Sequence, residues 1–427
     1  MPCADVRHSE CGTVKLQLGA RVRQLSGSSQ VHGCARGSAR LANSPRVCEF
    51  WRHEGKRFTG WWHVSSLVEV ARAAGVAVST ASRVLSGSSH PISARTRAKV
   101  LAVAAELEYS PSALARAMVS PHSRLVGVLV SDIDNPYFSV IARGVDDVAT
   151  RAGYVTMLSN VDRRTATEIS RLQAMRDYRA AGVIFAGSGH VDDPQAPDLV
   201  KAVRRAQEQG IQTVSLAVRD LGCPSVVVDN RAVAYDITDH LVALGHRRVA
   251  FIEGPPGMTV TRHRREGFLS RMADAGLADG ALCRPGGFDY QSGHAATLRL
   301  IAHRPLPDAV LAANDEAAVG ALSALRQAGI DVPGEISVAG MDDLRTAEFV
   351  DLTTVRLPLY EMGSLAARHI IDTAARAGSA SASPGTPATA TGAEGAADGA
   401  ATTVLSHRVV PRGTTARRPK GPDRPHP

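Results

Sequence analysis

Residues 66–87 read SLVEVARAAGVAVSTASRVLSG, and this stretch decides the fold of the first part of the chain. Ser66 and Glu69 have the S-x-x-E spacing of a capping box, which marks the start of a helix. The apolar residues that follow recur at the spacing of one helix face: Leu67, Val70, Ala71 and Ala74. Gly75 then supplies a turn, so the sequence predicts a short helix that ends near residue 74.

The next two helices complete a small helical unit. VAVSTASRVL predicts a helix with an apolar face, made by Ala81, Val84 and Leu85, and a polar face that carries Ser79, Thr80, Ser82 and Arg83. A third helix is expected from Ser93 to about Leu107, with a buried side made by Val100, Leu101, Ala104 and Leu107. Three short helices with one polar face are typical of a DNA-reading module, although two helices around a glycine also occur in proteins that never bind DNA.

The identities of the residues are more specific for a protein family than their spacing. Together with ISARTRAKVLAVAAELEYSPSALARAM at residues 92–118, this stretch resembles the N-terminal domain of the LacI/GalR family of bacterial transcription regulators almost position for position. The resemblance implies that base edges of the major groove are read by Val78, Ser79 and Thr80. Ser82 and Arg83 match the positions that follow, and Arg83 can form a bidentate contact with a guanine or a phosphate. The resemblance places contacts to backbone phosphates at Leu67, His90, Ser93 and Thr96, although each of these four could instead be a cap or a surface residue. Val78 is apolar, so we expect it to contact a thymine methyl group.

YSPSALARAM at residues 109–118 resembles the hinge of the same family, which becomes helical when a dimer is seated on its operator. In the family, a leucine from each hinge helix wedges open a base step in the minor groove, and Met118 occupies that position here. The resemblance thus implies DNA contacts from Tyr109, Ser112, Ala115 and Met118. A linker whose Leu114 and Met118 pack on the body is the alternative.

From residue 124 onward, apolar runs alternate with helical stretches, as in repeated βαβ units. LVGVLV, VTMLS, GVIFAG and TVSLAV begin at residues 125, 155, 182 and 213, and VVVD, VAFIEG, AVLAAN and ISVAGM follow at residues 226, 249, 309 and 336. Strands that are apolar on both faces need helices on both sides, which predicts parallel sheets. The fold class is therefore an all-α head followed by an α/β body.

Polar residues directly follow many of these runs: Asp132, Asn160, Asn230, Asn314, Asp315, Asp342 and Asp343. Ligands of open α/β sheets bind at the carboxyl ends of the strands, so several such residues together favour a ligand cleft. Each of them could equally cap the helix that follows its strand.

The body is similar to the effector domain of the same family, which resembles periplasmic sugar-binding proteins with two lobes joined by crossover strands. SDIDNPYF (131–138), LVALGHRRVAFIEGP (241–255), AANDEAAVGAL (312–322) and ISVAGMDD (336–343) carry the resemblance, which extends from Ser66 to about Arg412. It implies an apolar wall from Tyr137 and Phe138, an arginine in the cleft at Arg264, and a stacking ring at Phe288. Effector hydroxyls would bind Asn314 and Asp342, with Asp132 assisting.

Three residues depart from that pattern. Val218 stands where many relatives have an aspartate, and Met258 and Val260 are apolar beside the arginine motif. The cleft therefore offers a ligand fewer polar groups than is usual in the family. The sequence does not specify the ligand, nor even that it is a sugar. Arg264 also has a structural alternative as an ion-pair partner of Glu266 or Asp289.

Charge and composition divide the chain further. The net charge is +8, of which residues 1–120 carry +9, residues 121–403 carry −6 and residues 404–427 carry +5, so a polyanion would meet the first part. We expect five segments: an extension at 1–63 that is disordered or a misassigned start, a helical head at 64–108, a hinge at 109–121, a two-lobed body at 122–412, and a disordered tail at 413–427. Within the body, the Ala/Gly/Ser/Thr run at 377–402 predicts a low-complexity insert.

Several classes are disfavoured. No run approaches eighteen consecutive apolar residues and no signal segment is recognisable, so we expect a cytoplasmic protein without membrane contact. The six cysteines form no C-x-x-C pair, and no phosphate loop or hydrolase motif is present, so neither a metal, a cofactor nor catalysis is expected.

These observations predict a homodimeric transcription factor, most often a repressor in the family, which binds a pseudo-palindromic operator under control of a small, sugar-like effector. A sugar-binding protein of transport type, or a small-molecule enzyme on a doubly wound fold, is the alternative. Neither alternative explains residues 66–118.

Overall fold

The computed structural model describes residues 65–86, 90–109, 123–380 and 401–418. The head holds three helices: α2 (Leu67–Ala74), α3 (Val78–Leu85) and α4 (Ala94–Glu106). The capping box of α2 is present, because the Ser66 side chain accepts from the Glu69 amide and the Glu69 carboxylate accepts from the Ser66 amide. Gly75 ends the helix at φ 65°, a conformation that glycine adopts without steric cost. The predicted order of helices is confirmed.

The head has a core of small side chains contributed by all three helices: Val70, Ala71, Ala74, Ala81, Val84, Val100 and Ala104. The prediction that Leu101 is buried was wrong, because half of its side chain is exposed to solvent. Leu101 and Val100 are neighbours and point in different directions on α4. Val103 packs against the core instead.

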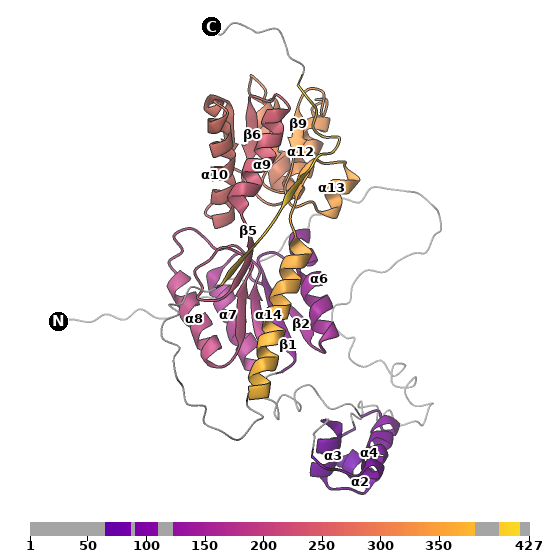
Figure 1. The fold of residues 1–427 in the computed structure, drawn as a ribbon. Helices are drawn as coiled ribbons and strands as arrows, with labels where there is room; N and C mark the ends of the chain where they lie inside the picture. Colours follow the sequence, from indigo (N-terminus) through magenta and orange to yellow (C-terminus); the bar gives the residue numbers. More distant parts are fainter. Residues whose placement is uncertain (1–64, 87–89, 110–122, 381–400, 419–427) are drawn as a thin grey trace, which may run out of the picture. The chain divides into compact units, whose positions relative to one another are not determined.

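The first lobe of the body is a parallel six-stranded sheet in the order β11-β5-β4-β3-β1-β2. Its strands are β1 (Leu125–Val130), β2 (Val155–Asn160), β3 (Gly182–Phe185), β4 (Gln212–Ser215), β5 (Ser225–Val228) and β11 (Thr402–Leu405). Its helices are α6 (Pro136–Arg151), α7 (Thr165–Asp177), α8 (Ala196–Glu208) and α14 (Leu359–Ala380). Helices α6 and α14 pack on one face of the sheet, and α7 and α8 pack on the other (Figure 1).

The second lobe repeats this plan around a parallel sheet in the order β7-β6-β8-β9. Its strands are β6 (Val249–Ile252), β7 (Ala281–Arg284), β8 (Ala309–Ala312) and β9 (Ser337–Ala339). Its helices are α9 (Asn230–Ala243), α10 (Thr259–Asp274), α11 (Tyr290–Ile301), α12 (Asp315–Gln327) and α13 (Arg345–Phe349), with a 3-10 turn, η1, at Ala278–Gly280. Strand β7 was not predicted, because its short ALCR run lies at the sheet edge and is only half-buried.

An antiparallel ribbon of β10 (Thr354–Arg356) and β12 (Arg408–Val410) lies beside the second lobe. The chain therefore passes from one lobe to the other after β5, after β10 and between β11 and β12. This is the predicted two-lobed architecture with crossovers. It places the carboxyl ends of strands from both lobes near the crossing segments.

Two predictions about the C-terminal part need correction. The segment predicted as an insert at 377–402 begins inside α14, which continues to Ala380, and Thr402 already belongs to β11. Residues 413–418 of the tail that was predicted to be disordered are ordered. The Thr414 carbonyl accepts from the Val338 amide at 2.8 Å and the Arg418 amide donates to the Leu244 carbonyl at 2.9 Å, so main-chain hydrogen bonds hold these residues on the second lobe.

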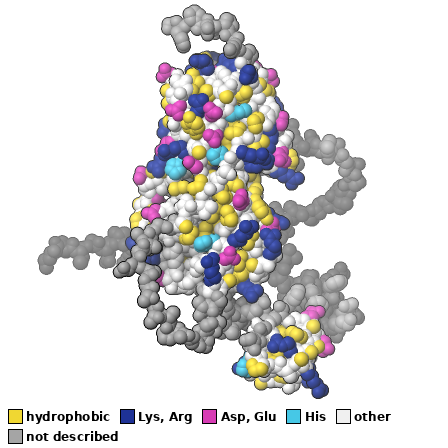
Figure 2. Space-filling view, in the orientation of Figure 1, with side chains coloured by type: hydrophobic (Ala, Val, Ile, Leu, Met, Phe, Trp, Pro, Cys, Tyr) yellow, Lys and Arg dark blue, Asp and Glu magenta, His cyan; other side chains and the backbone are white. Residues whose placement is uncertain are grey.

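The surface of the body carries both signs of charge. On the face in Figure 2, acidic and basic side chains are interspersed over both lobes. No helix in the described part of the chain has the length and apolarity needed to cross a lipid bilayer.

Candidate ligand-binding site and nucleic-acid interface

Helix α3 presents the predicted base-reading residues on its outer side. Val78 is 43 % exposed, Ser79 and Arg83 are exposed, and Thr80 and Ser82 are half-buried beside the core residue Ala81. An exposed apolar side chain at the start of a helix gains nothing from the core of its own domain. This arrangement suits contact with another molecule, and a guanidinium at the end of the helix can bind a guanine edge or a phosphate.

The remaining head residues fall into two groups. Ser93 caps α4, because its hydroxyl accepts from the Thr96 amide at 3.1 Å and lies 2.8 Å from the Thr96 hydroxyl, so these two residues already have a structural role. Leu67 and Tyr109 pack against the head core, and His90 is exposed. The predicted hinge contacts Ser112, Ala115 and Met118 lie outside the described residues.

A pocket lies where the two lobes meet. It is bordered by residues that follow strands of both sheets, as expected for open α/β sheets. Its polar lining consists of Ser131, Asn135, Tyr137, Arg163, Ser188, Asn230, Thr259, His263, Arg264, Asn314 and Asp342. Its apolar lining consists of Phe138, Ala186, Leu216, Ala217, Val218, Val227, Val228, Met258, Val260 and Phe288.

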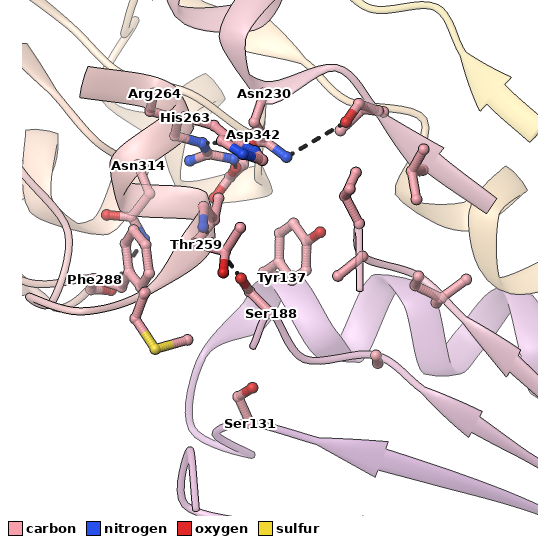
Figure 3. A pocket seen from close by; sticks show the side chains of 18 of the residues that line it. Ser131, Tyr137, Ser188, Asn230, Thr259, His263, Arg264, Phe288, Asn314 and Asp342 are labelled. Carbon is pink, nitrogen blue, oxygen red and sulfur yellow. Dashed lines mark hydrogen bonds and ion pairs between the residues drawn. The ribbon is translucent and has the colours of Figure 1, made fainter. Parts of the chain in front are cut away.

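Arg264 is the central charged residue of the pocket, and it is only 4 % exposed. Its Nε donates to Asn230 Oδ1 at 2.9 Å, its Nη1 donates to the Ala313 carbonyl, and its Nη2 lies 3.3 Å from Asp342 Oδ1. Figure 3 shows Arg264, Asn230 and Asp342 gathered with His263 at one end of the pocket. The alternative prediction, an ion pair of Arg264 with Glu266 or Asp289, was wrong. Glu266 pairs with Arg231, and Asp289 caps α11. Arg264 therefore ties α10 to the ends of β5 and β8.

Two buried carboxyl groups, Asp342 and Asp315, interact with each other, and Asp342 also pairs with Arg264. Burial raises the pKa of Asp342 and the Arg264 guanidinium lowers it. Burial has the larger effect, so the resulting pKa is about 6. Burial and the neighbouring Asp342 raise the pKa of Asp315 well above its usual range. Asp315 accepts from the Leu344 amide at 2.7 Å and from the Thr354 hydroxyl at 2.5 Å, so it fixes the loop that carries Asp342.

That loop has an unusual backbone. Asp342 and Asp343 have φ values of 119° and 56°, a region that residues with a side chain rarely occupy. Asp343 forms ion pairs with Arg356 and with Arg412, the latter at 2.6 Å, and these hold the turn. Backbone strain of this kind is common where a structure presents a side chain to a ligand.

Four other predicted residues also line the pocket: Tyr137, Phe138, Phe288 and Asn314. Asn314 caps α12, accepting from the Ala317 amide at 3.0 Å, and its amide donates to the Phe288 carbonyl at 3.0 Å. It therefore both caps a helix and faces the pocket, and it keeps one lone pair and one N–H for a ligand. The Tyr137 hydroxyl forms no hydrogen bond with another described residue. Burial and then the nearby Asp342 carboxylate raise the pKa of Tyr137, so its hydroxyl keeps its proton.

Asp132 is the one predicted effector residue that does not line the pocket. Its carboxylate lies 2.8 Å from Arg163 Nη2, and Arg163 lines the pocket in its place. A direct ligand contact from Asp132 is therefore not supported, because this carboxylate is turned toward the arginine. Asp132 positions Arg163, which follows the end of β2.

Several polar lining residues were not predicted as effector contacts, among them Arg163, Ser188, Asn230 and His263. Asn230 was recognised as a residue that follows a strand but was not chosen. Arg163 comes three residues after the end of β2 at Asn160, so the strand-end rule applied to loops rather than to single positions would have found it. His263 precedes Arg264 on α10, and no pattern in the sequence distinguishes it.

Main-chain contacts join the two lobes at one edge of the pocket. The Thr259 amide donates to the Gly189 carbonyl at 2.9 Å, and the Val191 amide donates to the Gly257 carbonyl at 2.7 Å. The Val260 amide donates to the Ser188 hydroxyl at 3.2 Å. A ligand in the pocket therefore touches elements of both lobes and can influence how they close.

Comparison with known proteins gives matches over the head and the body. The family model "Bacterial regulatory proteins, lacI family" matches residues 66–112, and the model "Periplasmic binding proteins and sugar binding domain of LacI family" matches residues 123–386. The ribose operon repressor of Escherichia coli K12 is 33 % identical over 312 residues, which cover 71 % of this chain and 91 % of the relative. The chain belongs to the LacI family.

Solved structures agree with this assignment. A crystal structure of the Lac repressor dimer bound to operator and the anti-inducer ONPF is 25 % identical, with a TM-score of 0.67 over 82 % of this chain and 99 % of the other. A LacI family transcriptional regulator from Enterococcus faecium with bound ribose is 26 % identical, with a TM-score of 0.57 over 69 % of this chain and 100 % of the other. The predicted family and fold are confirmed, and so is the prediction that this LacI-family chain is a DNA-binding transcriptional regulator rather than an enzyme.

Proposed function

We propose that this LacI-family regulator is a homodimeric repressor whose affinity for a pseudo-palindromic operator depends on a sugar-like effector in the pocket between the lobes. The observation that carries the proposal is that one chain joins a three-helix head, with Arg83 exposed on α3, to a body with a polar and aromatic pocket. The similarity to a ribose operon repressor and to a ribose-bound regulator supports the sugar-like effector. Operator binding as a dimer is supported by the similarity to the Lac repressor dimer bound to operator.

The coupling between effector binding and operator binding follows from thermodynamic linkage. A ligand shifts the equilibrium between two arrangements of the lobes only by the difference in its affinity for them. Typical couplings are about 1–3 kcal/mol, which corresponds to a change in operator affinity of roughly 5- to 150-fold. Because α10 carries Arg264 and also contacts Gly189 of the first lobe, a ligand that binds Arg264 acts on the contact between the lobes. Release and tightening of the operator complex are both compatible with this mechanism.

The DNA-contacting residues are part of the same proposal. Val78, Ser79, Thr80, Ser82 and Arg83 would read base edges, and the hinge residues up to Met118 would enter the minor groove. Replacing Met118 with Gly should weaken binding to the operator more than binding to random DNA, because a wedge acts at one base step. Equal losses on both, measured by fluorescence anisotropy, would remove the wedge from the proposal.

A transport-type sugar-binding protein is the alternative. It would need the pocket but would have no use for the exposed face of α3.

A regulator of transcription works where the chromosome is, so the proposal includes a cytoplasmic location.

The experiment measures binding of the full chain to the DNA upstream of its own coding region by footprinting and anisotropy, with and without a panel of sugars. The proposal predicts a protected, pseudo-palindromic site and at least one sugar that changes the affinity. Sugar binding without any protected site on this or other genomic fragments would favour the transport-type alternative.

A further inference from the structure

The first lobe has an end that takes no part in the pocket. The carboxyl ends of its parallel strands face the second lobe, so the amino ends of β1, β2, β3 and β4 lie at the opposite end (Figure 1). Arginines recur in the stretches that lead into these four strands, and we call these six residues the basic edge: Arg124, Arg151, Arg176, Arg179, Arg204 and Arg205.

The two ends of the first lobe carry opposite charge. The stretches 123–124, 151–154, 176–181 and 204–211 hold the six arginines of the basic edge and only two acidic residues, Asp177 and Glu208. At the carboxyl ends, the loops 131–135, 161–164, 186–193 and 216–220 hold six aspartates and three arginines. Since residues 121–403 as a whole carry a net charge of −6, the basic edge is a local excess of positive charge on an acidic body.

Half of the basic edge is free to bind another molecule. Arg124, Arg151 and Arg205 are exposed, and none of them lies within ion-pair distance of a carboxylate in the part of the chain that the structure describes. Their guanidinium groups therefore have N–H donors to spare, and a guanidinium keeps its positive charge at any physiological pH.

A fourth arginine is held in place without being neutralised. Arg176 Nε donates to Gln209 Oε1 at 2.9 Å, and its Nη1 donates to Gln173 Oε1 at 2.6 Å. Amide oxygens are uncharged, so these bonds orient the guanidinium and leave its charge in place. Arg204, by contrast, is paired with Glu208, with Nε 3.3 Å from Oε1.

Helix ends account for only part of the basic edge. Arg151, Arg176 and Arg205 lie in the last turns of α6, α7 and α8, where the helix dipole favours a positive charge. Arg124 and Arg179 lie in loops, where no helix dipole acts in this way. The clustering of charge at this end of the lobe therefore needs a further explanation.

The chain that arrives from the head enters the body at the basic edge. The Ser123 amide donates to the Arg179 carbonyl at 2.8 Å, and the Ser123 hydroxyl donates to the Tyr178 carbonyl at 2.9 Å. The described part of the head ends at residue 109, fourteen residues earlier, and a chain of that length spans at most about 50 Å. The basic edge is thus the end of the body to which the DNA-binding head is tethered.

We infer that the basic edge is a second DNA-contacting surface, which binds backbone phosphates of the duplex that the head holds and does not read its sequence. Guanidinium groups bind phosphates through paired hydrogen bonds, and each phosphate that is neutralised releases counterions. The tether to the head favours DNA over an acidic protein as the partner. The inference goes beyond the proposed function, which assigns DNA contacts to the head and hinge alone.

The test measures the affinity of the full chain for its footprinted operator and for a random duplex by fluorescence anisotropy, between 50 and 200 mM salt. The double variant Arg124→Gln, Arg151→Gln removes two charges and keeps polar side chains. Its affinity for both duplexes should fall by the same factor. The slope of log affinity against log salt should become shallower by about 0.9 for each phosphate contact removed.

A matched control comes from the other end of the same lobe. Arg164 is exposed and lies in the loop after β2, so Arg164→Gln removes one charge from the carboxyl end and should keep the affinity and salt slope of the wild type. Unfolding temperatures check that both proteins fold. The random duplex keeps the test independent of the proposed function, because its binding requires neither an operator nor an effector.

Two results would overturn the inference. One is a double variant with the affinities and salt slopes of the wild type on both duplexes; if it also loses binding to polyglutamate, the basic edge is a surface for an acidic protein. The other is a loss of affinity confined to the operator, because a surface that binds only phosphates affects all sequences alike.

Discussion

The outer face of α3 and the pocket of the body are both binding surfaces, but they are built in different ways. The residues of the α3 face come from six consecutive positions, 78–83, on one helix. The residues of the pocket lie between positions 131 and 342 and meet only when two sheets and their connections are in place. Helical periodicity brings together the first set, whereas only the tertiary fold brings together the second. Damage to the head should therefore stay local, and damage to the pocket should affect the whole body.

The largest effect is expected at the α3 face. Arg83→Ala should lower affinity for the specific operator by about 1–3 kcal/mol in each half-site, since one guanidinium contact is lost twice in a dimer. Binding of effector and the unfolding temperature of the body should not change. Arg72→Ala removes the same charge from an exposed position on α2 and serves as the control. Retained sequence-specific footprinting by Arg83→Ala would refute its role in base reading.

Arg264→Ala tests the opposite behaviour in the pocket. The change leaves Asp342, Asn230 and the Ala313 carbonyl without their shared partner, so the body should lose about 3–5 kcal/mol of its free energy of unfolding. The effector response should also disappear. Arg262→Ala, on the exposed side of the same helix, should cost less than about 0.5 kcal/mol. Chemical denaturation of both variants makes the comparison, and equal stabilities would show that Arg264 is not a structural centre.

Protonation of Asp342 in the pocket gives the next largest effect, which is a change in the free energy of unfolding with pH. The folded pKa of Asp342 is about 6 against 3.8 for a free aspartate, so its charged form disfavours folding. The penalty is absent below about pH 4 and complete above about pH 6, and it amounts to something on the order of 3 kcal/mol. The free energy of unfolding of the wild type, relative to Asp342→Asn, should therefore fall as pH rises from 4 to 6. A flat difference between the two proteins over this range would contradict the burial of a titrating carboxyl group.

The sequence predicted the local features and missed those that depend on tertiary contacts. The capping box at Ser66, the turn at Gly75 and most strands were predicted, because they depend on neighbours a few residues away. Leu101 was wrongly placed in the core, since helical spacing alone does not decide between two adjacent apolar residues. The role of Asp132 was also missed, because its partner Arg163 lies 31 positions away. The ordered segment at 413–418 depends on hydrogen bonds to β9, which no local pattern announces.

A smaller effect tests the register of α4 in the head. Val100 is fully buried and Leu101 is half exposed, although they are neighbours. Val100→Ala should destabilise the head by about 2 kcal/mol, through lost burial and the cavity left behind. Leu101→Ala should change its stability by less than about 0.5 kcal/mol. Thermal unfolding followed through loss of operator binding measures both, and a larger loss for Leu101→Ala would show that the register is wrong.

The central claim is that a ligand bound in the pocket controls the affinity of the head for DNA. Its most direct test is a titration of the full chain, bound to its footprinted operator, with the sugar that binds best to the isolated protein. The account predicts a saturable change in operator affinity in the wild type and none in Arg264→Ala at compound concentrations that saturate the wild type. Saturation of the pocket with no change in operator affinity would contradict it.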